Sequence, residues 1–158
     1  MDTAALVQRL AIQLQARQWM LATAESCTGG LIAGACTDLS GSSNWFERGF
    51  VTYSNEAKTE LLGVDAALIT QHGAVSEAVA RAMAAGSLAH AQAQVAVAVT
   101  GVAGPTGGTA DKPVGLVWFG LALPGQVLTE KMHFPGDRAA VRAATVQHAL
   151  RRLVELTA

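Results

Sequence analysis

Residues 19–39 of the chain read WMLATAESCTGGLIAGACTDL and combine three patterns in one stretch. The first part, 19–24, is an apolar run that is too short and too sharply bounded for a helix, which predicts a strand. Residues 29–39 have helical character and are followed by serines and a glycine that end the helix. A strand that turns directly into a helix is a building unit of α/β folds, and here the turn is ESCTGG, residues 25–30.

The rest of the chain continues this alternation of helices and strands. Leucines at positions 6, 10 and 14 recur at helical spacing and predict a first helix over 3–17. The run VAVAVT, 95–100, has the β-branched and small apolar character of a central strand covered on both faces. Further strands are predicted at 46–54, 114–123 and 127–134, and further helices at 55–63, 64–73, 77–92 and from Asp137 onward.

These elements predict one domain, residues 1–158, of three-layer α/β/α type. Helices between the early strands require parallel pairing, whereas the late hairpin requires antiparallel pairing. The expected sheet is therefore a mostly parallel mixed sheet of about five strands with an antiparallel edge strand. In such a sheet, ligands gather beyond the carboxyl ends of the strands.

The composition describes a globular protein with a small partner. Of the 158 residues, 51% are hydrophobic and 15% are charged, and the formal net charge is -1 with no block of lysine or arginine. This charge balance predicts no basic patch that would attract nucleic acid or an anionic membrane. No apolar run approaches the ~20 residues of a membrane span, so no membrane association is expected.

The two cysteines and the acidic residues predict neither a disulfide nor a metal site. Cys27 and Cys36 lie around one helix start, and no signal peptide precedes them, which is typical of reduced thiols in a cytoplasmic protein. No cluster of histidine, cysteine, aspartate and glutamate has the spacing of metal ligands. Neither a metal nor a cofactor is therefore expected.

Three polar clusters follow three of the predicted strands. ESCTGG follows the first strand, YSNEAK (53–58) follows the second, and TGVAGPTGG (100–108) follows the third. Because the carboxyl ends of parallel strands share one edge of the sheet, these clusters are expected to converge on one site.

The turn ESCTGG allows two interpretations. Ser26 or Thr28 can simply cap the following helix. The same free N–H groups can instead hold a phosphate or the oxyanion of an acyl-transfer intermediate, with Gly29 and Gly30 allowing a ligand to approach the backbone. On this pattern alone Ser26 and Cys27 are both candidate nucleophiles, although the turn lacks the G-x-S-x-G motif.

A serine nucleophile needs a base, and the cluster YSNEAK contains one. None of the four histidines stands in a motif with an aspartate, which disfavours a Ser-His-Asp triad. Lys58 can act as a base if burial removes its proton, with Tyr53 beside it. The alternative is a solvated helix lysine and a tyrosine at a strand end, and the spacing does not decide between the two.

Two further features suggest binding of a nucleotide-sized anion. Thr100, Gly101 and Gly104 belong to a glycine-rich loop that matches neither a Walker loop nor G-x-G-x-x-G, but is long for a mere connection. Arg138 and Arg142 share a face at the start of the last helix, where a cation opposes the helix dipole unless an anion binds there. A surface ion pair is the alternative for these arginines.

Several blocks of the sequence resemble a known family. The blocks TAESCTGG, GSSNWFERGFVTYSNEAK, HGAVSE, TGVAGPTGG, KPVGLVWF and GDR occur in the order seen in the CinA C-terminal family of nicotinamide-nucleotide amidases. The resemblance implies hydrolysis of nicotinamide mononucleotide to nicotinate mononucleotide and ammonia, a step in pyridine nucleotide recycling. It also implies a metal-independent serine amidase that forms homo-oligomers.

The family's catalytic residues can be carried over to this chain. The nucleophile falls on Ser26, the base on Lys58 and the family's tyrosine on Tyr53. The resemblance makes Cys27 a donor of its backbone N–H rather than a nucleophile, while Glu25 is expected to bond to Lys58 or to the substrate.

Three expectations remain open at this level. The substrate phosphate is expected on Arg138 or Arg142 together with amides of residues 101–108. Some family members carry a larger N-terminal domain, and this chain is expected to be the stand-alone form. The competing hypotheses are a cysteine nucleophile and a non-catalytic nucleotide-binding module.

Overall fold

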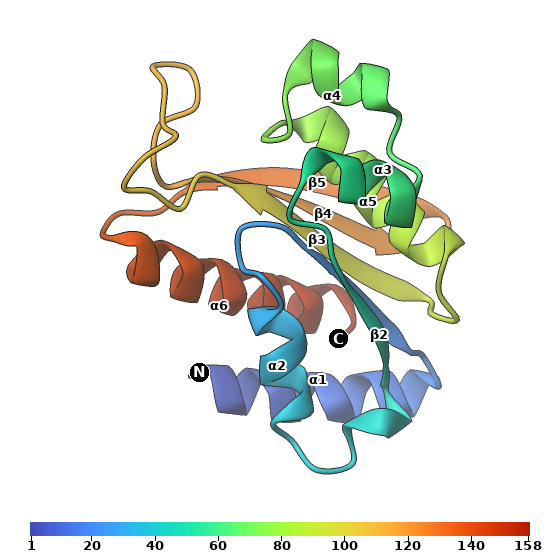
Figure 1. Ribbon diagram of the computed structural model, residues 1–158. Coiled ribbons are helices and arrows are strands. Elements are labelled where there is room, and N and C mark those ends of the chain that lie inside the picture. The colour runs from blue at the N-terminus through green and yellow to red at the C-terminus, as the bar shows by residue number, and fades with distance from the viewer.

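The computed structural model describes all 158 residues (Figure 1). The helices are α1 (Thr3–Arg17), α2 (Leu31–Thr37), α3 (Asn55–Leu62), α4 (Ala66–His72), α5 (Glu77–Ala89) and α6 (Arg138–Leu156), with a short 3-10 turn at Ser42–Asn44. The strands are β1 (Leu21–Glu25), β2 (Phe46–Val51), β3 (Val95–Gly101), β4 (Leu116–Leu123) and β5 (Gln126–His133). Each predicted element is present, with ends shifted by a few residues.

The five strands form one sheet in the order β2-β1-β3-β4-β5. Strand β1 pairs in parallel with β2 and β3, whereas β4 pairs antiparallel with both β3 and β5. Helices α1, α2 and α6 lie on one side of the sheet, and the green helices α3, α4 and α5 lie on the other (Figure 1). The predicted three-layer α/β/α fold with a mixed sheet is confirmed.

Strand β3 shows how the sequence divides the core between the two faces. Its valines, Val95, Val97 and Val99, pack with α1 and α6, whereas Ala96 and Ala98 pack with α5. Successive side chains of a strand point to opposite faces, so the alternation of valine and alanine places bulk on one face only. The small face lets α5 approach the sheet closely.

Two glycines are required where α5 closely approaches its neighbours, one against helix α3 and one against the sheet. A Cβ atom at Gly86 of α5 would overlap the carbonyl oxygen of Leu62, and one at Gly120 of β4 would overlap the carbonyl oxygen of Ala80. Only glycine therefore fits at these two contacts, of α5 with α3 and of α5 with β4.

We expect Gly86→Ala to lower the free energy of unfolding by about 3 kcal/mol, because backbone must move to admit the methyl group. Gly34→Ala is the matched control: Gly34 lies in α2 with open space around it, so alanine there should stabilise by about 0.5–1 kcal/mol. Urea unfolding of the three proteins measures both effects. Equal stability of Gly86→Ala and the unmodified chain would contradict the packing argument.

Helix α2 begins two residues later than the sequence predicts. Gly29 and Gly30 have φ angles of 59° and 106°, in the left-handed region, so the helix starts only at Leu31. This region suits glycine because it has no Cβ. The two glycines therefore belong to the turn that follows β1 rather than to the helix.

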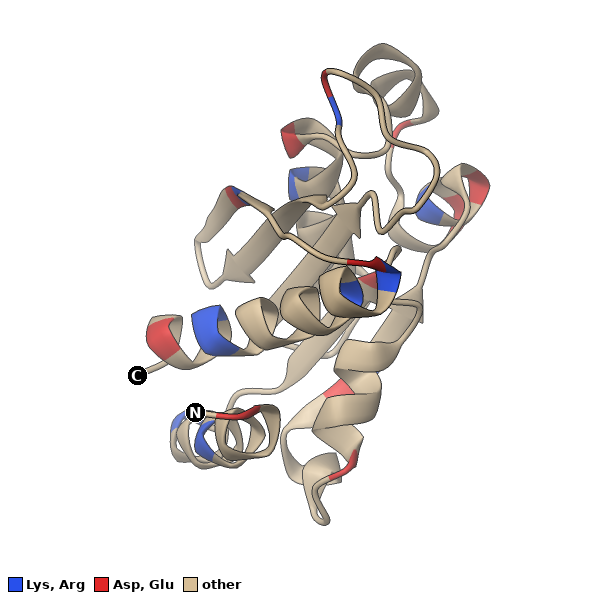
Figure 2. Ribbon diagram, turned by 90° about the vertical axis from the view of Figure 1, so that its left-hand side faces the viewer, with Lys and Arg blue, Asp and Glu red and all other residues tan.

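The fold brings the carboxyl ends of β1, β2 and β3 to the same edge of the sheet. Charges of both signs are interspersed over the face that Figure 2 shows. No helix combines the length and the hydropathy that crossing a membrane would require.

Candidate active site

The three polar clusters meet in one cavity at the strand ends. Its volume is about 220 Å³. The predicted site residues that line it are Ser26, Cys27, Tyr53, Lys58, Thr100, Gly101 and Arg138. Asn55, Ala74, Val75 and Ala103 also line it. The first three of these were missed as site residues, although Asn55 lies inside YSNEAK and the other two lie inside HGAVSE. The convergence inferred from the sheet topology is therefore observed.

Lys58 reaches Ser26 at the bottom of this cavity. Its Nζ lies 3.0 Å from Ser26 Oγ, 2.9 Å from the carbonyl oxygen of Thr52 and 3.3 Å from that of Tyr53. The side chain of Ser54 caps α3 and so places Lys58 in its first turn. Long helical side chains point back toward the helix N-terminus, and here that direction leads to the end of β1.

Lys58 is an unpaired buried amine. Its residue is only 1% exposed, and no carboxylate forms an ion pair with it. Burial therefore lowers the pKa of Lys58 below its ordinary value of 10.5. A neutral amine can donate to the carbonyl groups of Thr52 and Tyr53 and keep its lone pair for the Ser26 hydroxyl. The sequence alternative of a solvated lysine does not hold.

Cys27 lies beside Ser26 but has the wrong electrostatics for a nucleophile. The residue is 6% exposed, and burial raises the pKa of the Cys27 thiol to about 11. Burial likewise raises the pKa of Cys36 to about 12, and both cysteines are free. Because the thiolate is the reactive form, Cys27 is almost entirely unreactive at neutral pH.

Glu25 accepts hydrogen bonds from the ESCTGG turn and from the start of helix α2. Its Oε1 accepts hydrogen bonds from the Thr28 hydroxyl at 2.5 Å and from the Ile32 amide at 2.8 Å, and its Oε2 accepts one from the Ala33 amide at 3.0 Å. Helix α2 has no capping side chain of its own, because Gly30 is its N-cap residue. The carboxylate thus takes the capping role that the sequence left to Ser26 or Thr28, and it contacts neither Lys58 nor the cavity lining.

The two arginines of α6 occupy different positions. Arg138 lines the cavity, where its Nη1 donates to the carbonyl oxygen of Gly104 at 2.9 Å and its Nη2 to the Tyr53 hydroxyl at 3.3 Å. Tyr53 is 60% exposed, so this pair forms the rim of the cavity. Arg142 instead lies against the ESCTGG turn, where it donates to the carbonyl oxygens of Cys27 and Thr28.

Most of the remaining predicted residues support the cavity without lining it. Four of these residues lie outside the lining, namely Thr28, Gly29, Gly30 and Gly104. Thr100 does line the cavity, and its hydroxyl donates to the carbonyl oxygen of Ala74 at 2.9 Å. The backbone N–H of Ser26 donates to the carbonyl oxygen of Val99, and the backbone N–H of Gly29 donates to the carbonyl oxygen of Ser26. The N–H groups of Cys27 and Thr28 have no acceptor in the protein, but only Cys27 lines the cavity, whereas Thr28 is fully buried outside the lining.

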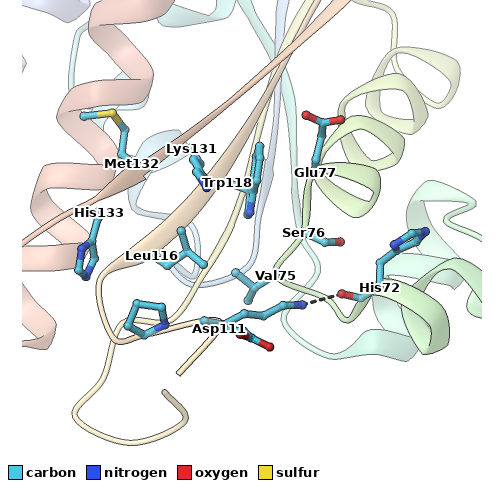
Figure 3. Close-up of a pocket in the computed structure, with 12 residues that line it drawn as sticks. His72, Val75, Ser76, Glu77, Asp111, Leu116, Trp118, Lys131, Met132 and His133 are labelled. Carbon is cyan, nitrogen blue, oxygen red and sulfur yellow. Dashed lines mark hydrogen bonds between the residues drawn. The ribbon is translucent and has the colours of Figure 1, made fainter. Parts of the chain in front are cut away.

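A larger cavity of about 570 Å³ adjoins the first one and shares Val75 with it (Figure 3). Its lining consists of His72, Val75, Ser76, Glu77, Asp111, Lys112, Pro113, Leu116, Trp118, Lys131, Met132 and His133. None of these residues is Ser26, Lys58 or Tyr53, and no histidine lines the smaller cavity. The nucleophile and base candidates therefore belong to the smaller cavity, without a histidine.

The CinA C-terminal domain family matches residues 3–157. The chain is 58% identical over 147 residues to nicotinamide-nucleotide amidohydrolase PncC of Enterobacter agglomerans, covering 90% of each chain. It is 51% identical over 149 residues to the protein of the same name in Escherichia coli K12, covering 94% of this chain and 90% of the relative.

Among solved structures, the competence/damage inducible protein CihA of Agrobacterium tumefaciens is similar with a TM-score of 0.97 and 48% identity. The match covers 100% of this chain and 97% of that one. A match of this extent, together with the family match over nearly every residue, leaves one assignment: the chain belongs to the CinA C-terminal domain family.

Proposed function

We propose that this protein hydrolyses the carboxamide of nicotinamide mononucleotide to nicotinate mononucleotide and ammonia. The observation that carries the proposal is the contact between the buried amine of Lys58 and the hydroxyl of Ser26, beside the Cys27 N–H, which lines the cavity and has no acceptor. The names of the relatives at 51% and 58% identity support this substrate. Serine nucleophile, amine base and a free amide are the three groups that amide hydrolysis without a metal requires.

In the first step Ser26 attacks the carboxamide carbon. Neutral Lys58 takes the hydroxyl proton, and the C=O double bond opens to an oxyanion that the N–H of Cys27 stabilises. Collapse of this tetrahedral intermediate breaks the C–N bond, and the proton on Lys58 passes to the leaving nitrogen, which departs as ammonia. An ester between Ser26 and the nicotinoyl group remains.

In the second step water hydrolyses this ester. Lys58 accepts a proton from the water, whose oxygen attacks the acyl carbon, and then returns that proton to Ser26 as the ester bond breaks. The direct contact of Lys58 with Ser26 favours this route over a relay through Tyr53, whose hydroxyl bonds to Arg138 at the rim. We assign the substrate phosphate to Arg138 and to amides of the loop 101–108, because the Arg138 side chain lines the cavity and the residue is exposed to solvent.

The deciding experiment mixes purified protein with nicotinamide mononucleotide and excess chelator and follows ammonia. Continued release with chelator present supports the proposed metal-free reaction. No ammonia at high enzyme concentration, combined with binding of the mononucleotide by calorimetry, would favour a non-catalytic binding module. Strong inhibition by the chelator would exclude the mechanism proposed here.

The pH dependence of kcat/KM should report the ionisation of Lys58. Burial lowers this pKa below 10.5, and only the neutral amine can accept the serine proton. We therefore expect kcat/KM to rise about tenfold per pH unit below the lowered pKa and to level off above it. A profile that is flat over this range, or that falls as pH rises, would show that Lys58 is not the base.

A further inference from the structure

Arg142 holds the turn that carries Ser26. Its Nε donates to the carbonyl oxygen of Cys27 at 3.1 Å and its Nη2 donates to that of Thr28 at 3.2 Å. No carboxylate pairs with its guanidinium, although it lies near the positive end of α6, where the helix dipole disfavours a cation. The two hydrogen bonds to the turn are therefore the polar contacts that the structure gives this arginine.

The two carbonyl groups held by Arg142 control the direction of the free amides. In a trans peptide the C=O and the following N–H point in opposite directions, so fixing the Cys27 carbonyl aims the Thr28 N–H away from Arg142. The Thr28 carbonyl shares its peptide with the Gly29 N–H, which donates to the Ser26 carbonyl at 3.0 Å. That bond in turn orients the peptide that ends in the Cys27 N–H.

Both amides aimed in this way lack an acceptor in the protein. Ser26 and Cys27 line the cavity, whereas Arg142 and the fully buried Thr28 do not, so the Cys27 N–H is the one that can meet a ligand. Gly29 adopts a left-handed φ of 59° in this turn, and a Cβ there would lie 3.5 Å from Arg142 Nη2. The guanidinium, the glycine and the two peptide planes therefore form one connected arrangement on the side of the turn opposite the free amides.

We infer that Arg142 is a positioning residue for the oxyanion donor: by holding the Cys27 and Thr28 carbonyls, it fixes the turn so that the N–H of Cys27 stays directed at the reacting carbonyl oxygen. The inference rests on the proposed function. This role differs from phosphate binding, because Nε and Nη2 of Arg142 donate to carbonyl oxygens of the turn. Arg138, which lines the cavity, remains the phosphate candidate.

The two roles predict different kinetics for Arg142→Met. Loss of an oxyanion donor lowers kcat by about 10²–10³-fold, and we expect a loss in this range with KM changed by less than about threefold. Arg142→Lys should be nearly as slow, because an ammonium cannot reproduce the guanidinium's hold on two carbonyls. Arg81→Met is the matched control, since Arg81 donates to the Val127 carbonyl on strand β5 and should leave both constants unchanged.

A second measurement tests Arg142 without the substrate phosphate. An uncharged alkyl fluorophosphonate reacts with an activated serine, and its phosphoryl oxygen needs the same N–H donor. The rate of Ser26 modification should therefore fall in Arg142→Met by a factor similar to that in kcat. Thermal unfolding of each variant separates this effect from loss of the fold, and Arg142→Lys serves if Arg142→Met does not fold.

A raised KM with unchanged kcat and an unchanged phosphonylation rate would overturn the inference and assign Arg142 to the phosphate. An unchanged kcat with unchanged KM would overturn it as well. If the unmodified protein releases no ammonia from nicotinamide mononucleotide, the proposed function fails. The phosphonylation rates then still decide whether Arg142 positions the donor beside Ser26.

Discussion

Replacement of Ser26 by alanine is expected to lower kcat for ammonia release by about 10⁴–10⁶-fold, as is typical when an enzyme loses its nucleophile. The reason is that no other group in the cavity can replace it: the Cys27 thiol has a pKa of about 11, and the Tyr53 hydroxyl lies at the rim with Arg138. Steady-state kinetics with nicotinamide mononucleotide at neutral pH provide the measurement.

Cys27→Ala is the matched variant for Ser26→Ala. It removes the neighbouring thiol but keeps the backbone N–H, so kcat should stay within about threefold of the unmodified protein. Mass spectrometry after rapid quenching should find the nicotinoyl group on Ser26 in both the unmodified protein and Cys27→Ala. Activity that survives Ser26→Ala and disappears in Cys27→Ala would assign the reaction to the thiol.

Replacement of Lys58 by methionine is expected to lower kcat by about 10³-fold or more, because the serine loses the base that takes its proton. Methionine has a similar length and no charge, so the variant fills the same buried space. Lys131→Met on strand β5 is the control, since Lys131 is exposed and lies over the Trp118 ring outside the Ser26 cavity. Unchanged kcat in Lys58→Met would exclude the amine as the base.

The same variant, Lys58→Met, should also change how the free energy of unfolding depends on pH. Because burial lowers the pKa of Lys58 in the folded protein, the unfolded chain binds more protons between that lowered pKa and 10.5. The contribution of Lys58 to the free energy of unfolding should therefore rise with pH through this window, and it is complete above 10.5 and lost as pH falls through the folded pKa. The raised thiol pKa values of Cys27 and Cys36 act in the opposite direction above about pH 9, so the contribution of Lys58 is the difference between the unmodified protein and Lys58→Met. Urea unfolding at several pH values should find this rise absent in Lys58→Met.

Local patterns in the sequence were sufficient to locate the candidate site. The short apolar run of β1, the two glycines and the helix after them predict a strand-to-helix turn, and parallel pairing places the ends of β1, β2 and β3 together. Ser26 and Lys58 could be named because they occupy such ends and match the family blocks. The prediction of Ser26 rather than Cys27 as nucleophile also came from the resemblance, and the raised pKa of the buried Cys27 thiol supports it.

The roles of Glu25 and Arg142 could not be predicted from these patterns. Glu25 reaches the amides of Ile32 and Ala33 only because Gly29 and Gly30 turn the chain back over it. Arg142 meets the Thr28 carbonyl across 114 positions of sequence, and that contact depends on how α6 docks on the sheet.

The sequence by itself determined the fold class and the strand ends that carry polar groups, and the family resemblance added Ser26 and Lys58 as the predicted nucleophile and base. The sequence could determine the fold class because helix and strand periodicity, turn residues and parallel pairing are governed by interactions between near neighbours or by general rules of topology. The tertiary structure decided that Lys58 is buried and unpaired, that Cys27 stays protonated and that Arg142 holds the turn. These properties depend on which groups from distant segments exclude water from one another, and only packing specifies that.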